Sequence, residues 1–222
     1  MAFSIFPDIR FNYGDTIFAS VPEGLGWNAL NSDGWKAGPV AKFRFARQED
    51  NGGSPFVVSG GSDALRGLGD ISAAGELGAF VEKRLGDAGQ WRLRAEVRHG
   101  VGGHDGIIAD ASIAYQTRLG RTIISVGPRM SAASADFMRV YFGTDAVQSA
   151  RSGLAQYRPS GGLLSYGFGG TLIRPLDQRN TITLFTGVDQ LGSPAAHAPL
   201  VRLRGQKTQF SIGVGYGFRF SL

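Results

Sequence analysis

The 222-residue chain is long enough for one barrel or sandwich domain, and it contains 34 glycines, no cysteine and 18% charged residues. The lack of cysteine excludes disulfides, thiol catalysis and cysteine-ligated metals, and no run approaches the roughly 18 apolar residues that a membrane-spanning helix needs. The net charge of +5 is spread along the chain instead of gathering in basic runs, so we expect no nucleic-acid partner, and such a chain can enter a membrane only as a closed barrel.

Ten segments alternate apolar with polar or small residues, which is the period of two expected for a strand with two different faces. In chain order they cover residues 3–13, 16–30, 35–47, 74–86, 90–100, 107–118, 122–132, 162–174, 181–190 and 207–222. The first segment follows directly on Met1, so we expect no signal peptide in this sequence. The second is expected to break near Pro22.

The connections between these segments differ in length. Those at residues 48–72, 134–160 and 191–206 are long, the one at 102–106 is medium, and the others after the second strand are short. Short periplasmic turns opposite long external loops are typical of outer-membrane barrels. Ten strands would place both termini on the periplasmic side. The first connection, Tyr13–Asp15, would then lie on the external side, and it is shorter than the loops expected there. Within the second long loop, Thr144 to Leu154 is expected to form a short helix that ends at Gly153.

The last segment shows the alternation most clearly. Its apolar face consists of Phe210, Ile212, Val214, Tyr216, Phe218 and Phe220. It is about as long as a tilted membrane-crossing strand, and we expect it to close the barrel and to be the signal that the barrel-assembly machinery recognises. The predicted fold class is therefore all-β: a closed antiparallel transmembrane β-barrel of about ten strands, in a single domain over residues 1–222.

A soluble barrel with its apolar face inward would also alternate. Lipid outside is favoured by aromatic residues near strand ends and by a polar face that mixes small with charged residues. Cationic and anionic residues on that face are expected to line the lumen: Asp8, Arg10, Lys42, Arg44, Glu76, Glu82, Arg84, Arg92, Arg94, Glu96, Arg98, Asp110, Arg118, Arg129, Asp189 and Arg219. They form either an anion-attracting pore or a salt-bridged network that fills a narrow barrel, and we favour the network because unpaired buried charge is costly.

Two other stretches are candidate sites. His99, His104 and Asp105, with Asp110 nearby, could suggest a metal or catalytic site, but the sequence has neither a Gly-x-Ser-x-Gly elbow nor a His-Glu-x-x-His motif, so we expect no enzyme, no metal and no cofactor. The loop 136–159 is the best candidate for specific recognition or for an inward-folded plug, and a solvated loop over the mouth is the alternative. Its candidate residues are Phe137, Tyr141, Phe142, Arg151 and Tyr157.

Several stretches resemble one known family. They are Tyr13-Gly14-Asp15, Gly24 to Asn28, Ser32 to Trp35, Gly38-Pro39, Gly67 to Asp70, Gly103 to Gly106, Tyr141 to Gly143, Gln148 to Leu154, Tyr157, Ser193-Pro194, Leu200-Val201 and Gly205. With the aromatic C-terminal strand, they make the chain similar to the MltA-interacting protein (MipA/OmpV) family of Gram-negative outer-membrane proteins. The family usually has one more glycine-rich strand before Phe3, which would imply up to twelve strands in a full-length form.

The resemblance implies an integral outer-membrane protein surrounded by lipids and lipopolysaccharide. It implies a non-enzymatic scaffold or structural protein of the cell envelope, linked to machinery that synthesises and hydrolyses murein. A porin-like channel for small anionic solutes is the alternative, because the lumen face is basic. A lipid-modifying outer-membrane enzyme is a second alternative, which the residues around His99 and His104 would have to support.

Overall fold

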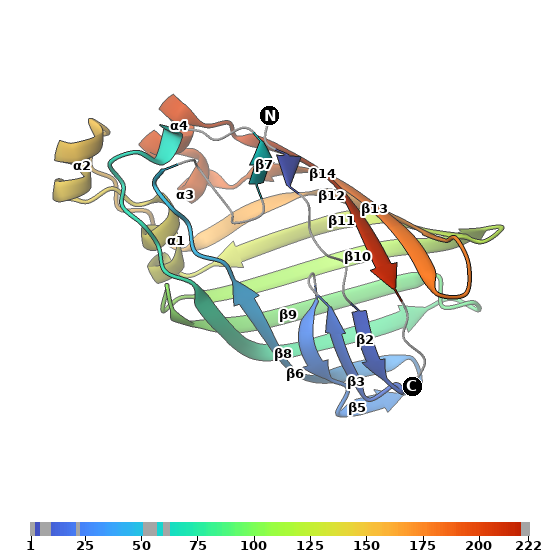
Figure 1. The fold of residues 1–222 in the computed structure, drawn as a ribbon. Coiled ribbons are helices and arrows are strands. Elements are labelled where there is room, and N and C mark those ends of the chain that lie inside the picture. Colours follow the sequence, from blue (N-terminus) through green and yellow to red (C-terminus); the bar gives the residue numbers. More distant parts are fainter. Residues whose placement is uncertain (1–2, 5–9, 21–22, 51–56, 60–62, 219–222) are drawn as a thin grey trace.

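The computed structural model describes residues 3–4, 10–20, 23–50, 57–59 and 63–218, and these form an antiparallel, mostly β structure (Figure 1). Along the main sheet, the strands in spatial order are β14 (Thr208–Phe218), β13 (Asn180–Leu191), β12 (Gly162–Pro175), β11 (Thr122–Ala133), β10 (Ile107–Leu119), β9 (Trp91–Gly102), β8 (Ala74–Leu85), β6 (Trp35–Arg44), β4 (Gly24–Trp27), β3 (Ile17–Ser20) and β2 (Arg10–Tyr13). A short strand, β5 (Leu30–Ser32), pairs with the start of β6. The predicted all-β antiparallel fold is confirmed.

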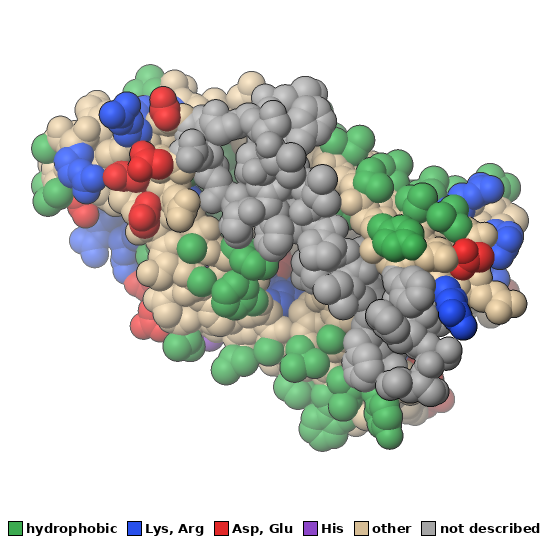
Figure 2. Space-filling model, viewed as in Figure 1, with side chains coloured by type: hydrophobic (Ala, Val, Ile, Leu, Met, Phe, Trp, Pro, Cys, Tyr) green, Lys and Arg blue, Asp and Glu red, His purple; other side chains and the backbone are tan. Residues whose placement is uncertain are grey.

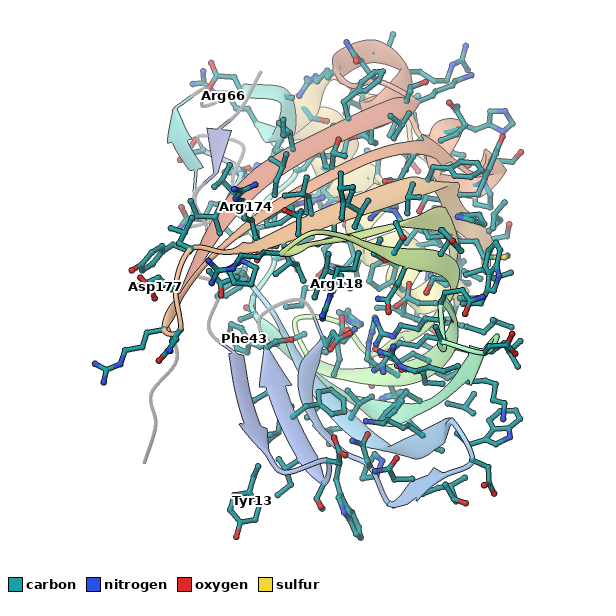
Figure 3. The ribbon with its side chains drawn as sticks, turned by 90° about the vertical axis from the view of Figure 1, so that its right-hand side faces the viewer. Tyr13, Phe43, Arg66, Arg118, Arg174 and Asp177 are labelled. Carbon is teal, nitrogen blue, oxygen red and sulfur yellow. The ribbon has the colours of Figure 1, made fainter. Side chains whose placement is uncertain are left out.

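The sheet curls into a trough with two different faces. Viewed from the short-turn end, it passes from β12–β14 at the top, through β8–β10, to β2–β4 at the lower left, and Arg118 lies inside the curl (Figure 3). The outer face is apolar: Leu77, Val97, Phe168 and Phe210 are all more than half exposed. Figure 2 shows apolar side chains along the outside of the sheet and charged side chains towards its two ends. This is the alternation that the sequence predicts.

The segment predicted as one strand over residues 16–30 reverses direction near its middle. β3 pairs antiparallel with β4, with Ser20 opposite Gly24, so the break expected near Pro22 is a hairpin. This adds one strand, and the path through the sheet contains eleven. It also explains the turn at Tyr13–Asp15, which lies at the same end as the other short turns. The predicted strand 3–13 is described only as β1 (Phe3–Ser4) and β2, because residues 5–9 lie outside the described part.

The two edges of the sheet run in the same direction. Every neighbouring pair on the path from β14 to β2 is antiparallel, so the first and the eleventh strand are parallel to each other. Among the described residues no pairing joins them. Closure by antiparallel pairing alone requires an odd number of additional strands between these edges.

All long connections gather at one end of the trough (Figure 1). They hold β7 (Val57–Ser59), η1 (Asp63–Leu65), α1 (Ala135–Phe142), α2 (Ala146–Ser152), α3 (Ser193–Ala196) and α4 (Pro199–Arg204). The predicted helix that ends at Gly153 is confirmed as α2, and Gly153 takes the left-handed conformation with φ of 73°. β1 pairs with β7, so the N-terminal strand lies with the long loops, and the expectation that both termini lie at the short-turn end is wrong.

None of the described helices is both long and apolar enough to cross a membrane.

Candidate functional site

The candidate site is a network of charges on the inner face of β6, β8, β9 and β10. Three glutamates form its centre: Glu76 and Glu82 on β8 and Glu96 on β9 are each at most 5% exposed. Positions 76 and 82 of β8 face the same side as Arg94 and Arg98 of β9, because Gly78 lies opposite Arg98 and Glu82 opposite Arg94. The alternation of the strands therefore brings carboxylates and guanidinium groups together.

Arg98 is surrounded by three carboxylates. Its Nε donates to Glu76 Oε2 over 2.9 Å, its Nη2 donates to Asp110 Oδ2 over 2.7 Å, and its Nη1 donates to Glu96. The residue is only 4% exposed. A buried guanidinium with all sides engaged is stable only because these partners replace its hydration. The arrangement fixes the spacing of β8, β9 and β10 on the inner face.

The other cations complete the network on either side of Arg98. Lys42 on β6 places its Nζ 2.7 Å from Glu96 Oε1. Arg44, also on β6, contacts Glu76 on β8. Towards the short-turn end, Arg92 Nη2 lies 2.6 Å from Glu82 and 2.7 Å from Glu23. Arg94 bridges Glu82 and Glu96, and Arg84 reaches Glu82 over 3.5 Å. Within the described residues, six cations thus face five carboxylates: Lys42, Arg44, Arg84, Arg92, Arg94 and Arg98 against Glu23, Glu76, Glu82, Glu96 and Asp110.

Three of the predicted lumen residues, Arg118, Arg129 and Asp189, lie away from this network. Arg129 on β11 and Asp189 on β13 form a separate pair, in which Arg129 Nε lies 2.8 Å from Asp189 Oδ1. Arg118 on β10 makes no ion pair with a described residue. Arg10 lies in β2, but its side chain is outside the description, as are residues Asp8 and Arg219. The inner face of β11–β14 instead carries small residues, including Ser125, Gly127, Gly167 and Gly187.

A buried histidine extends the network to the long-loop end. The His104 ring is fully buried, with Nε2 at 3.1 Å from Glu76 Oε1, and the backbone N–H of Gly106 donates to Nδ1 over 3.3 Å. Nδ1 is therefore an acceptor, so Nε2 carries the proton that is donated to Glu76. The ring fits only because residue 100 is glycine: a Cβ there would lie 2.0 Å from His104 Cε1.

The proposed grouping of histidines as a metal or catalytic site does not form. His99 is on the outer face of β9, half exposed, at 3.5 Å from Asp105, whereas His104 points inward to Glu76. In the described ranges, three or more histidine, aspartate or glutamate side chains do not come together in a metal-binding arrangement. The partner role of His104 was missed by sequence reasoning; its position between glycines in Gly103–Gly106 was the only signal.

Helix α1 packs across the long-loop end of the network. Met138 and Phe137 are buried in a small core with Ile108, Ala133 and Ala195. The Phe137 and Tyr141 rings stack with centroids 4.5 Å apart, and the Arg44 guanidinium lies 5.1 Å from the Phe137 centroid. Burial raises the pKa of Tyr141 and lowers the pKa of Arg47, whose Nη1 donates to the Tyr141 carbonyl over 2.9 Å. Aromatic side chains of α1 thus cover charged groups of the inner face.

The remaining candidate loop residues have separate positions. Phe142 lies at the end of α1 against the same small core. Arg151 on α2 is half exposed and lies 3.1 Å from Glu49, and Tyr157 donates its hydroxyl to the Pro194 carbonyl over 2.9 Å. On β14, Phe210, Ile212, Val214 and Tyr216 are all exposed. The side chain of Phe218 and the whole of Phe220 lie outside the description.

An open cavity remains beside the charged wall. It measures about 630 Å³ and extends from Lys42, Arg92 and Arg94 on one side to Ser131 and Ser165 on the other. The charged residues that line it are of both signs. The network therefore fills only the half of the trough nearest β6–β10.

Comparison with known proteins assigns this chain to one family. The model of the family described as "MltA-interacting protein MipA" matches residues 1–220. No curated protein and no solved structure matches the chain. The match spans nearly all of the sheet, the charge network and the helices at the long-loop end, and the chain belongs to the MltA-interacting protein MipA family.

Proposed function

We propose that this protein is a non-enzymatic scaffold of the Gram-negative outer membrane. It would hold a murein-processing enzyme, of the kind that the family description names, close to the membrane. Family membership supports a protein of the cell envelope. The exposed apolar outer face supports a membrane location, because a water-facing sheet would not leave Phe168 and Phe210 more than 60% exposed.

The observation that carries the scaffold proposal is the pairing of the inner charges. Arg98, the most buried cation of the network, forms ion pairs with three carboxylates. A pore that attracts anions needs cations that are free to meet the solute, and here six cations face five carboxylates. Helix α1 places Phe137 and Tyr141 over the same wall. These features support a rigid barrel whose wall charges are paired more than a conducting one.

The small anion channel remains a second candidate because of two observations. The cavity beside the charged wall measures about 630 Å³, and Arg118 points into the curl (Figure 3) without an ion pair to a described residue. A channel of this type would pass solutes along the small residues of β11–β14, opposite the network.

Two measurements test the proposal together. The refolded protein is immobilised in detergent, and a purified MltA-type transglycosylase is passed over it; we expect saturable binding that survives Arg118→Gln. In planar bilayers, we expect no stable conductance steps. Absence of binding contradicts the scaffold, and steady anion-selective steps that disappear with Arg118→Gln would establish the channel instead.

An enzymatic role is tested separately. We expect no lipase or acyltransferase activity on phospholipid in mixed micelles. An activity that is lost with His99→Ala but retained with the matched surface change His197→Ala would contradict the non-enzymatic proposal.

A further inference from the structure

A second cavity, of about 870 Å³, lies at the long-loop end outside the charge network. Its walls come from three segments far apart in sequence: residues 68–72 before β8, Gly102 and Gly103 at the end of β9, and residues 139–158 around α2. A volume of this size is typical of ligand pockets in proteins. Neither the charge network nor the scaffold proposal uses it.

The walls of this cavity are fixed by hydrogen bonds between the three segments. Thr144 and Tyr157 exchange two backbone hydrogen bonds of 2.9 Å. Gln148 Nε2 donates to the Leu68 carbonyl over 2.7 Å, which ties α2 to the loop before β8. Gly103 N donates to the Ala73 carbonyl over 3.0 Å, and a Cβ on Gly103 would lie 1.8 Å from the Ser72 oxygen. The cavity is therefore preformed, which lowers the entropic cost of binding a ligand.

One buried polar group in the wall lacks a partner. Thr144 is only 3% exposed, and its Oγ1 has no hydrogen-bond partner among the residues described. The oxygen itself is buried, so it lies beneath the surface of the cavity, where a ligand does not reach it. Thr144 therefore shapes the wall, and the hydrogen bonds to a ligand must come from the other residues that line the cavity.

The charged groups in the wall are balanced. Asp70 and Asp145 each use one carboxylate oxygen, for the backbone N–H of Glu49 and of Gln148, and the second oxygen accepts nothing from a described residue. Two guanidinium groups, of Arg139 and Arg158, also line the cavity. Arg139 pairs with Asp136, whereas exposed Arg158 makes no ion pair within the described ranges.

We propose that this cavity binds a short, uncharged oligosaccharide. An anionic ligand would meet the two carboxylates and a cationic one the two guanidinium groups, so neither sign is favoured. Sugar hydroxyls both donate and accept: they can donate to Asp70 and Asp145 and accept from Arg158. The proposal concerns the long-loop end alone and does not depend on the scaffold function.

The test uses the full chain, refolded in a detergent without a sugar headgroup. Neutral trisaccharides of glucose, galactose, mannose or N-acetylglucosamine are titrated by calorimetry and by saturation-transfer NMR, with orthophosphate as the anionic probe. We expect at least one trisaccharide to bind, and Arg158→Gln to weaken that binding about tenfold, since it removes charge-assisted hydrogen bonds. Thr144→Val, which keeps the shape and removes the buried hydroxyl, should leave the affinity unchanged.

The matched control is Arg202→Gln, on the exposed surface of α4 at the same end of the molecule. It should leave the affinity unchanged. Arg158 is exposed and bonds to no described residue, so its variant should fold even if Thr144→Val does not. The proposal is overturned if no trisaccharide binds at millimolar concentration, if Arg202→Gln weakens binding as much as Arg158→Gln, or if orthophosphate binds and displaces the sugar.

Discussion

Arg98 and Glu76 form the most buried ion pair among the described residues of the inner face: Arg98 Nε donates to Glu76 Oε2 over 2.9 Å, and neither residue is more than 4% exposed. They lie diagonally on neighbouring strands, since Arg98 is opposite Gly78. Glu76 also receives Arg44 and His104. One carboxylate thus links β6, β8, β9 and the turn before β10, so the Arg98–Glu76 pair connects four neighbouring parts of the curled sheet.

Removing Arg98 should destabilise the fold strongly. Arg98→Met keeps most of the volume but leaves Glu76 and Glu96 with one fewer buried cation, and breaking a buried pair in this way costs about 3–5 kcal/mol. Urea unfolding in detergent, followed by tryptophan fluorescence, measures the loss. Arg129→Met is the control, because its pair with Asp189 is partly exposed, with 43% of the Arg129 side chain accessible, and such pairs contribute at most about 1 kcal/mol. Equal losses for the two variants would contradict the central role of Arg98.

Gly100→Ala should disturb the position of His104. The added methyl group would lie 2.0 Å from His104 Cε1, so the ring must move away from Glu76, and overpacking of this kind costs about 1–3 kcal/mol. Gly75→Ala is the matched control on β8, because no atom lies within 4 Å of its added Cβ. The free energies of unfolding of the two variants are compared by the same urea titration. A Gly100→Ala variant as stable as Gly75→Ala would show that the ring has room.

Much of the sheet could be predicted from the sequence because side-chain alternation reports directly which face of a strand is apolar. The hairpin between β3 and β4 could not, since the residues around Pro22 and Gly24 fit a break in one strand as well as a reversal. The lengths of β3 and β4, four residues each, give too short a pattern to separate these alternatives. The extra strand and the parallel edges follow from that one ambiguity.

The site could be predicted only as a set of residues on one face. Alternation places both Arg98 and Arg118 on the inner face. The pairing register and the curl of the sheet then bring Arg98 next to three carboxylates, whereas Arg118 contacts no carboxylate of a described residue. Helices α1 and α3 escaped prediction because they are short and are held by packing: Met138 and Ala195 are both 0% exposed. Helix α2 was predictable because its Gly153 stop is a local signal.

Gly153→Ala should weaken the end of α2. Gly153 has a φ of 73° and its N–H donates to the Ser149 carbonyl, and a residue with a Cβ in this conformation costs about 1 kcal/mol. Gly153→Asn is the matched variant, because asparagine tolerates the left-handed region. Hydrogen exchange of the α2 amides should be faster in the alanine variant than in the asparagine one. Equal rates in both variants would mean that the Gly153 conformation does not limit the helix.

The hydroxyl of Tyr141 should not contribute to the stability of the fold at neutral pH, and it should lower that stability at high pH. Its Oη is buried and has no hydrogen-bond partner among the described residues, so Tyr141→Phe should keep or increase the free energy of unfolding. Tyr157→Phe is the contrast, because it loses the hydrogen bond to the Pro194 carbonyl and should cost about 1 kcal/mol.

The pH dependence of Tyr141 follows from its burial, which raises its pKa in the folded protein. An unfolded tyrosine ionises near about pH 10. Below that pH both states are neutral, and above it the unfolded state releases its proton first, so the stability of the wild type should fall as the pH rises past that value. Urea titrations on both sides of this pH, with tyrosinate absorbance as the ionisation signal, measure the effect. Tyr141→Phe should flatten this part of the profile, and a profile as steep as that of the wild type would show that other groups cause it.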